Sequence, residues 1–358
     1  MLYFERPSVG YKTRQPLSLS PWHFVNLSLP KSKHYCWLVC LLAAIGFTGC
    51  LPEGPTGADA YAWGRKGLDD GRFFKPRAIT IDKQDRLFIA DKTGRIQVFD
   101  RDGKFIRRWR IPEVYSGKPV GLSISHDDLL IVCDTHYFRV LFYTPAGELV
   151  PSRTIGGKNG RQPGEFGFIT DVVQDSSHNY YVGDYGDFDR IQKFDPDGNY
   201  VCEIGGHGES LGQFLRPQSL AMDANNHLWV ADACNHRIQV FDANVEPPKL
   251  LFHWGESGSA AGQLCYPYAI ELLDDGNVMI CEFGNHRVQK FTTDGKSLGV
   301  WGTAGKQPGQ FSQPWAMAVD SKNMIHIADT YNHRIQRFIF SSQTLPTTHS
   351  TENEDARQ

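Results

Sequence analysis

The sequence predicts an all-β fold, a six-bladed β-propeller, on three observations. The pentapeptide at 235–239, Asn-His-Arg-Ile-Gln, recurs almost unchanged at 285–289 and at 332–336. Short apolar runs bounded by Asp, Asn and Gly fill residues 54–340, with no sustained 3.6-residue apolar period. Alignment on the pentapeptide gives six copies of one unit, each with four short strands. Such an array predicts a ring of small sheets that leaves only short, protected edges.

Each copy is expected to open with an inner strand that follows a proline. These positions are Pro76, Pro119, Pro217, Pro267 and Pro314, with Ile169 in the third copy. A second apolar run ends in an acid, and a short loop leads to an arginine that starts the third strand. The acids are Asp91, Asp134, Asp184, Asp232, Glu282 and Asp329. The arginines are Arg95, Arg139, Arg190, Arg237, Arg287 and Arg334.

The acid and the arginine of a copy face each other across a hairpin, so we expect a carboxylate–guanidinium pair with bidentate hydrogen bonds. The asparagines of the motif are expected to take the left-handed conformation of the loop. They and the histidines that follow are Asn235, His236, Asn285, His286, Asn332 and His333. Because these histidines lie on separate blades, they are not expected to converge on one ion. The third copy has extra acids, Asp187 and Asp189, beside Asp184; we interpret them as a hydrated loop, with a surface cation site as the alternative. The motif is therefore interpreted as architecture.

A fourth strand ends each of the first five copies. It is marked by Arg108-Trp109, Ile155-Gly156, Ile204-Gly205, Trp254-Gly255 and Trp301-Gly302. The sixth copy lacks this element, whereas Ala60–Trp63 stands before the first proline without a copy of its own. We therefore predict that Ala60–Trp63 is the outer strand of the sixth blade and closes the ring non-covalently.

The proline, the Val-Ala-Asp run, the Asn-His-Arg-Ile-Gln-Val-Phe segment and the Asp-Gly turn together resemble the NHL repeat family. The resemblance covers residues 61–340, and it implies a six-bladed propeller. The second copy departs from the pattern, with Thr135-His136-Tyr137-Phe138 in place of Asn-His. Because such a fold hosts many functions, the function has to be argued from sites.

Residues 1–49 are predicted to be a lipoprotein-type signal peptide. Lys31 and Lys33 precede an apolar run at 35–47 that is too short to span a bilayer, which needs about 20 residues. Thr48-Gly49-Cys50 resembles the end of a lipobox, so Cys50 is the expected lipidation site. Residues 50–60 are a Pro/Gly tether, and residues 341–358 are a polar tail expected to be disordered. We thus expect a lipid anchor in the bacterial cell envelope, with the propeller facing the periplasm or exterior.

The net charge of −3 and the absence of a Lys/Arg tract in the propeller argue against nucleic-acid binding. Three of the eight cysteines precede the propeller, and the other five form no Cys-x-x-Cys pair. Cys133 and Cys281 occupy a position that holds alanine in other copies, which favours small core residues over a disulfide or zinc site. We expect no cofactor, no metal and a monomer.

The inner strands of a propeller line its central channel, where ligands usually bind. The residue after each proline position varies between copies, and two acids break the repeat further along. Asp171 replaces a small residue, and Glu271 replaces Thr80 and its equivalents. A departure from the repeat pattern often marks a functional position, which favours a role for these two acids in binding. The alternative is sequence drift, with both acids solvated. The candidate ligand-binding residues are Arg77, Thr170, Asp171, Gln218, Tyr268, Glu271 and Trp315.

These features favour a binding or scaffold module for a protein partner or a small ligand. The alternative is a propeller enzyme. Peptidyl-hydroxyglycine amidating lyases are similar propellers, and the resemblance implies zinc-binding histidines directly after the prolines. No histidine occupies that position in this sequence, and catalytic zinc needs three such ligands. A lactonase-type calcium site would need more converging oxygens than Asp171 and Glu271 supply. Catalysis is thus the less favoured interpretation, and we assign no catalytic residue.

Overall fold

The computed structural model describes residues 61–115 and 117–339. The predicted signal peptide, the lipidation of Cys50, the tether and the polar tail lie outside these residues. In the part of the chain that the structure describes, no helix is both long enough and apolar enough to cross a membrane.

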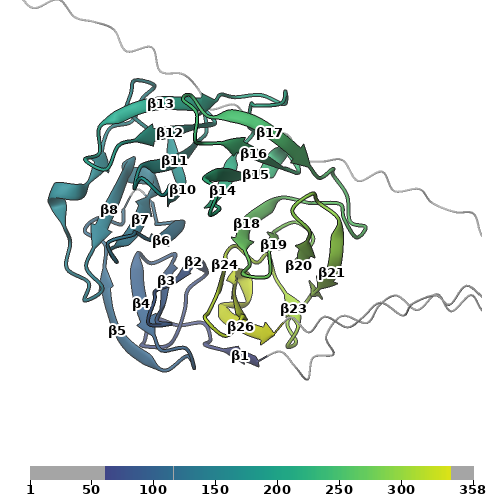
Figure 1. Cartoon of the computed structure of the whole chain (residues 1–358). Helices are drawn as coiled ribbons and strands as arrows, with labels where there is room; N and C mark the ends of the chain where they lie inside the picture. The colour runs from purple at the N-terminus through teal and green to yellow at the C-terminus, as the bar shows by residue number, and fades with distance from the viewer. Residues whose placement is uncertain (1–60, 116, 340–358) are drawn as a thin grey trace, which may run out of the picture. The chain divides into compact units, whose positions relative to one another are not determined.

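Six four-stranded antiparallel sheets stand around a central channel, as the sequence predicts (Figure 1). In each blade the strands are given from the channel outward. The first three blades are β2 (Pro76–Ile81), β3 (Leu87–Asp91), β4 (Arg95–Phe99) and β5 (Phe105–Arg110); β6 (Gly121–Ile124), β7 (Leu130–Asp134), β8 (Arg139–Tyr143) and β9 (Ile155–Gly156); and β10 (Phe168–Gln174), β11 (Tyr180–Tyr185), β12 (Arg190–Phe194) and β13 (Tyr200–Gly205).

The other three blades repeat this order. They are β14 (Pro217–Met222), β15 (His227–Asp232), β16 (Arg237–Asp242) and β17 (Lys249–Trp254); β18 (Pro267–Leu272), β19 (Val278–Glu282), β20 (Arg287–Phe291) and β21 (Ser297–Trp301); and β24 (Met317–Val319), β25 (Met324–Asp329), β26 (Arg334–Ile339) and β1 (Tyr61–Trp63). A short parallel pair, β22 (Thr303–Ala304) with β23 (Gln310–Phe311), precedes the last blade. The 3₁₀ helices are η1 (Thr135–Tyr137), η2 (Pro151–Arg153), η3 (Ala233–Asn235) and η4 (Thr330–Asn332).

The sixth blade is built from both ends of the described chain. β1 pairs antiparallel with β26, with Tyr61 opposite Arg337 and Trp63 opposite Ile335 (Figure 1). This is the place in which the sequence analysis puts Ala60–Trp63. On the inner side, the Thr330 hydroxyl donates a 2.6 Å hydrogen bond to the Pro76 carbonyl, which ties the sixth blade to the first.

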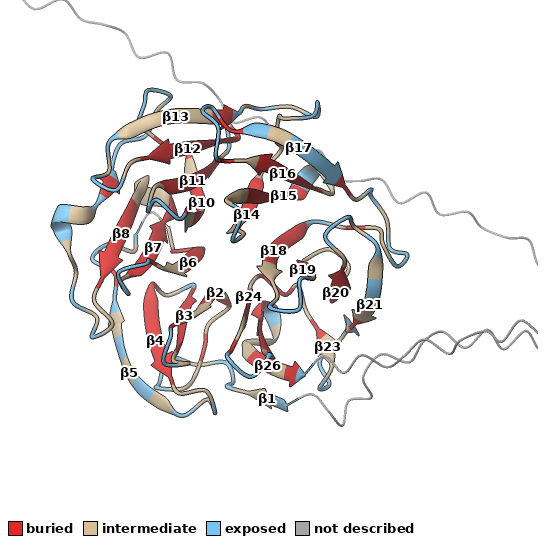
Figure 2. Ribbon diagram, viewed as in Figure 1, coloured by how far each residue is buried: buried red, intermediate tan, exposed pale blue. Residues whose placement is uncertain are grey.

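The hydrophobic core is divided among the six gaps between neighbouring blades. In the first gap, Phe88 and Val98 pack with Leu122 and Val132 of the second blade. Equivalent clusters of buried apolar residues fill the other gaps. The outer strands β5, β13, β17 and β21 are far more exposed (Figure 2). Burial of apolar area between blades is therefore the main stabilising term, and every blade depends on its neighbours.

The Trp-Gly and Asp-Gly elements of neighbouring blades contact each other in the folded structure. Two Asp-Gly turns, at Gly103 and Gly295, lie against the tryptophan of the preceding blade's outer strand. A Cβ atom built on Gly103 would lie 2.9 Å from the Trp63 ring, and one built on Gly295 would lie 2.5 Å from Trp254. Both glycines also have positive φ, 84° and 90°. Only glycine satisfies the turn conformation and the close ring contact together.

Candidate functional site

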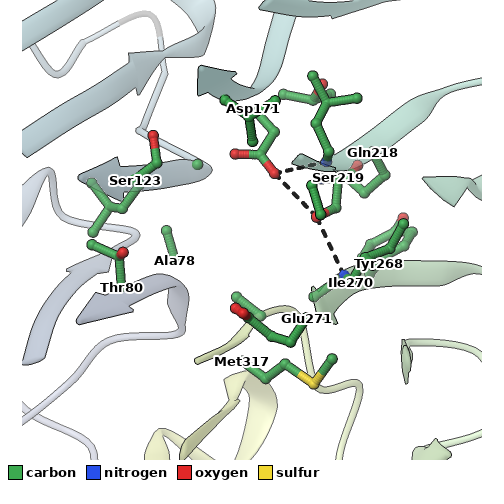
Figure 3. A pocket seen from close by; sticks show the side chains of 18 of the residues that line it. Ala78, Thr80, Ser123, Asp171, Gln218, Ser219, Tyr268, Ile270, Glu271 and Met317 are labelled. Atoms are coloured by element: carbon green, nitrogen blue, oxygen red, sulfur yellow. Dashed lines mark hydrogen bonds between the residues drawn. The ribbon is translucent and has the colours of Figure 1, made fainter. Parts of the chain in front are cut away.

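The inner strands enclose a central cavity of about 300 Å³ (Figure 3). Small side chains such as Ala78, Thr80 and Ser123 leave this space open on one side. Asp171 and Glu271 enter it from β10 and β18 (Figure 3). The volume is at the lower end of the range for small-molecule sites, roughly 300–1,000 Å³.

Asp171 is held firmly by its neighbours. Its carboxylate accepts hydrogen bonds from the Ser219 hydroxyl and the Leu220 amide, both at 3.0 Å (Figure 3). It also accepts the backbone N–H of the next residue, Val172, at 2.9 Å. Burial raises the pKa of Asp171 to about 6, and these hydrogen bonds oppose the rise. Asp171 thus joins the third blade to the fourth as well as lining the cavity.

Glu271 differs from Asp171 in having no hydrogen-bond partner among the described residues. Burial raises the pKa of Glu271 to about 8, and the nearby Asp171 carboxylate adds to the rise. The group is therefore largely protonated at pH 7, so it is able both to donate and to accept a hydrogen bond. A protonated carboxyl group without a hydrogen-bond partner in the chain is able to form hydrogen bonds with a ligand.

Aromatic side chains form one end of the cavity, where the inner strands begin. Tyr268 stacks on Phe283 with 4.5 Å between ring centroids, and Trp315 meets both rings edge-on at 5.0 and 5.5 Å. Tyr268 and Trp315 are 7% and 9% exposed, so the cluster is a wall that is already packed. The Trp315 indole N–H is buried there without an acceptor among the described residues.

Two arginines complete this end, which we call the channel mouth and define as Arg77, Arg216, Tyr268 and Trp315. The Arg77 guanidinium lies 4.6 Å from the centroid of the Trp315 ring, and the Arg216 guanidinium lies 5.1 Å from that of Tyr268. The Arg216 Nε donates to the Gln218 amide oxygen at 2.7 Å. Burial lowers the pKa of Arg77, with Arg216 among the further causes.

Six of the seven candidate residues border the cavity, and Arg77 stands at its mouth. Two of them have structural partners. The Thr170 hydroxyl donates to the Pro217 carbonyl at 2.6 Å, and Gln218 is committed to Arg216. The sequence analysis missed Arg216 and Phe283, because Arg216 precedes its strand and Phe283 comes from a hairpin loop. No signal in the sequence pointed to Arg216, because Lys75 and Lys118 hold the same position in the first two copies.

The hairpin acids and arginines form ion pairs in all six blades, with N–O distances from 2.5 to 3.4 Å. The expected bidentate geometry is wrong for most of them. Arg237 binds Asp232 through Nε at 2.8 Å and gives its other N–H groups to the carbonyls of Glu209, Ser210 and Gln213. Arg287 comes nearest to a bidentate pair. Five of the arginines thus donate to carbonyls of a loop 23 or more residues upstream, whereas Arg139 pairs with the Glu113 carboxylate.

The prediction that asparagine takes the left-handed position is also wrong. The histidines take it, with φ of 55° at His236, 56° at His286 and 59° at His333. The asparagine amides instead bridge the acid to a carbonyl of the upstream loop, as Asn235 does to Asp232 and Gly208. The local reason is the 3₁₀ turn, in which asparagine is the last residue and histidine the cap.

The left-handed histidines link consecutive blades. The Nδ1 atoms of His236, His286 and His333 accept backbone N–H groups of Tyr266, Gln313 and Lys75, at 3.1, 2.9 and 3.0 Å. In the third blade Asp189 takes this place and accepts the N–H of Arg216 at 3.1 Å. Asp189 is 4% exposed, so the interpretation of a hydrated loop is wrong for it. We call these contacts latches.

The other expectations concern absences. Within residues 61–115 and 117–339, no group of three or more His, Cys, Asp or Glu side chains is arranged to hold a metal ion. Cys133 and Cys281 are buried and unpaired in this part of the chain. The residues that follow the prolines present no imidazole to the cavity.

A family model described as the NHL repeat matches residues 214–241 and 311–338, which cover the first three strands of the fourth and sixth blades. The fourth and sixth blades thus match the NHL repeat. Similar curated proteins include NHL repeat-containing protein 3 of Mus musculus, 28% identical over 181 residues, or 47% of this chain and 52% of the relative. The chain thus spans about half the length of that relative. Peptidyl-glycine alpha-amidating monooxygenase A of Xenopus laevis is 29% identical over 195 residues, or 52% of this chain and 20% of the relative.

Solved structures with this fold include a streptogramin B lyase, with a TM-score of 0.55, 14% identity and coverage of 78% of this chain and 96% of the lyase. The virginiamycin B lyase of Staphylococcus aureus has a TM-score of 0.56 at 13% identity, over 79% of this chain and 99% of the lyase. At such identities the likeness establishes the propeller fold alone.

Proposed function

We propose that this NHL-repeat propeller is a binding module that holds a small polar molecule in its central cavity. The observation that carries the proposal is Glu271, a carboxyl group without a hydrogen-bond partner among the described residues, in a cavity with an aromatic wall at one end. A ligand that pairs with this carboxyl group gains a hydrogen bond, which typically contributes about 0.5–1.5 kcal/mol. The five equivalent positions carry no carboxyl group, since they hold Thr80, Ser123, Val173, Ala221 and Ala318.

The proposal is tested by blocking the cavity. The full chain is screened by thermal shift against small polar molecules, and the compounds that bind are titrated against Thr80→Phe, which fills the space beside Ala78. Thr80→Val is the matched control, since it keeps the volume of threonine. We expect Thr80→Phe to weaken binding at least tenfold and Thr80→Val to leave it within twofold. Equal affinity for Thr80→Phe and the wild-type chain would show that the ligand binds elsewhere.

A propeller enzyme is the second candidate. The raised pKa of Glu271 favours it, because a carboxyl group that titrates near the working pH suits general acid or base catalysis. The similarity to an amidating monooxygenase supports it for part of the chain. Incubation of the bound compound with wild-type chain and with Glu271→Gln separates the two functions. Recovery of the compound unchanged from the wild-type protein favours binding, whereas conversion that Glu271→Gln abolishes favours catalysis.

We further propose that the module is extracytoplasmic and anchored through a lipid on Cys50. The support is the sequence pattern before Cys50, with its basic flank, apolar run and Thr-Gly pair. Palmitate labelling of the expressed full chain tests this proposal. Labelling should be present in the wild-type chain and absent in Cys50→Ser, and labelled Cys50→Ser protein would exclude the anchor.

A further inference from the structure

The channel mouth brings two guanidinium groups into one continuous row of rings. Arg77 lies over Trp315 at 4.6 Å, the Trp315 and Tyr268 rings are 5.0 Å apart, and Arg216 lies over Tyr268 at 5.1 Å. Arg77 directly follows Pro76 of the first blade, and Arg216 directly precedes Pro217 of the fourth. Both therefore stand where inner strands begin, at the same end of the channel.

Neither guanidinium is neutralised by a carboxylate of the described residues. Arg77 makes no ion pair or hydrogen bond with them, and its Nε is buried without an acceptor. Arg216 has only the neutral Gln218 amide oxygen at 2.7 Å. The six hairpin arginines, in contrast, each have an acid. Two positive charges held close together without a counter-charge cost free energy, which a bound anion recovers.

The acids near this end of the channel are already committed. Asp189 accepts the backbone N–H of Arg216 at 3.1 Å and pairs with His207 at 2.6 Å. Asp171 is bound to Ser219 and Leu220 inside the cavity. These partners leave the guanidinium groups free to meet an anion from outside the chain.

The mouth also holds a further N–H donor without an acceptor. The Trp315 Nε1 is unpartnered in a side chain that is only 9% exposed, and it lies in the ring over which Arg77 stacks. The His136 Nδ1 is also buried without a partner among the described residues, and burial, followed by Arg77, lowers the pKa of this imidazole. Guanidinium and indole donors are those that bind carboxylate and phosphate oxygens. The aromatic wall adds a flat apolar surface for the body of the ligand.

We propose that the channel mouth is an anion-binding site, in which Arg77 and Arg216 hold the carboxylate or phosphate group of a small ligand with a flat apolar body. The Asp171 carboxylate repels an anion from the interior, so the charged group stays at the mouth and the other end points inward. This orientation rests on the proposed function, because it needs the central cavity to receive the rest of the ligand. The anion site itself does not depend on the cavity.

Four probes of similar shape test the charge preference: benzoate, phenyl phosphate, benzylamine and benzyl alcohol. Binding to the full chain is followed by calorimetry and by tryptophan fluorescence, since Trp315 lies at the site. We expect at least one anion to bind tenfold or more tightly than benzylamine and benzyl alcohol, with an affinity that falls as salt rises. The stronger of benzoate and phenyl phosphate identifies carboxylate or phosphate as the natural group. Equal binding of benzyl alcohol would overturn the proposal.

Variants then locate the site. Arg77→Gln and Arg216→Gln should each weaken anion binding at least tenfold, and Arg77→Lys should restore part of it. Arg110→Gln is the control, because Arg110 is exposed on the outer strand β5 and far from the row of rings. Melting curves that match the wild-type chain show that each variant is folded. Anion binding that survives Arg77→Gln and Arg216→Gln would disprove the site.

Thr80→Phe separates this proposal from the proposed function. If anions bind this variant as they bind the wild-type chain while no compound depends on the cavity, the anion site holds and the cavity proposal fails. If neutral or cationic compounds fill the cavity and no anion binds the wild-type chain, the cavity proposal holds and the anion site fails.

Discussion

Arginine side chains have opposite surroundings in the hairpin ion pairs and at the channel mouth. Arg95 is 1% exposed and spends its N–H groups on Asp91 and on carbonyls of an upstream loop. Arg77, two strands nearer the channel in the same blade, contacts the Trp315 ring and has no acceptor among the described residues. The first arrangement recurs in every blade, whereas the second occurs at one position of the ring. An arginine whose N–H groups are bound within the chain, as in every blade, has a structural role. An arginine without acceptors that occurs at one position of the ring is a candidate for ligand binding.

The largest expected effect comes from breaking a hairpin pair. Arg95→Met leaves the Asp91 carboxylate buried without its counter-charge, which costs about 3–5 kcal/mol. The same substitution at the mouth, Arg77→Met, should cost no more than about 1 kcal/mol, since only the contact with the Trp315 ring is lost. Urea unfolding of the two variants measures the contrast. A similar loss of stability in both would contradict the distinction between the two regions.

Ring closure is expected to come second. Trp63 contacts Phe73 and Phe99, with centroid distances of 5.6 and 4.8 Å, and also packs on Gly103. Trp63→Ala should destabilise the propeller by roughly 2–3 kcal/mol, less than for a fully buried ring because Trp63 is half-buried. Tyr61→Ala on the same strand is the control, since Tyr61 is 54% exposed. Equal effects of the two changes would argue against β1 as the closing strand.

Replacing Glu271 is expected to raise the stability of the chain at high pH, whereas the two preceding substitutions lower stability. Its pKa is raised to about 8 in the folded chain, so the folded state holds the proton more tightly than the unfolded state. Stability is then lost as pH rises from the unfolded pKa of about 4.3 through 8. Glu271→Gln should be more stable than the wild-type chain at pH 9, on the order of 1–2 kcal/mol, and equal to it near pH 4. Asp274→Asn, at an exposed position nearby, should show no such divergence in melting temperature.

The latches should give the smallest effect. His333→Asn keeps a residue that tolerates positive φ but removes the acceptor for the Lys75 amide, at a cost of about 1 kcal/mol near pH 7.5. Burial lowers the pKa of His333, so its contribution is present above the unfolded pKa of about 6.5 and is lost as pH falls below it. The difference in melting temperature between variant and wild type should therefore shrink between pH 7 and pH 5. A constant difference across that range would refute the latch.

The fold was predictable from the sequence because each copy repeats the same pattern of turns and charged residues. An acid at the end of the second strand and an arginine at the start of the third define one hairpin, and six such hairpins define six sheets. The roles of asparagine and histidine were exchanged, since the sequence does not show which of two adjacent loop residues takes positive φ. That choice depends on the upstream loop, which meets the asparagine only after folding.

The site was partly predictable for a related reason. Glu271, Tyr268 and Trp315 stood out because they break the rule of their own repeat. Phe283 and Arg216 did not, because their positions vary in every copy and so carry no rule to break. Side chains from different blades meet at the mouth through the geometry of the ring, and no spacing within one copy encodes that meeting.

The pairing of β1 with β26 also sets the order in which the propeller is completed during synthesis. The first five blades are each made from one consecutive stretch of chain, so each has all its strands soon after it leaves the ribosome. The sixth blade has to wait, because Tyr61 is made before all the other strands and its partner Arg337 is made after the first five blades. Until β26 is available, β1 has no strand to pair with. Ring closure is thus the last step in the assembly of the six blades.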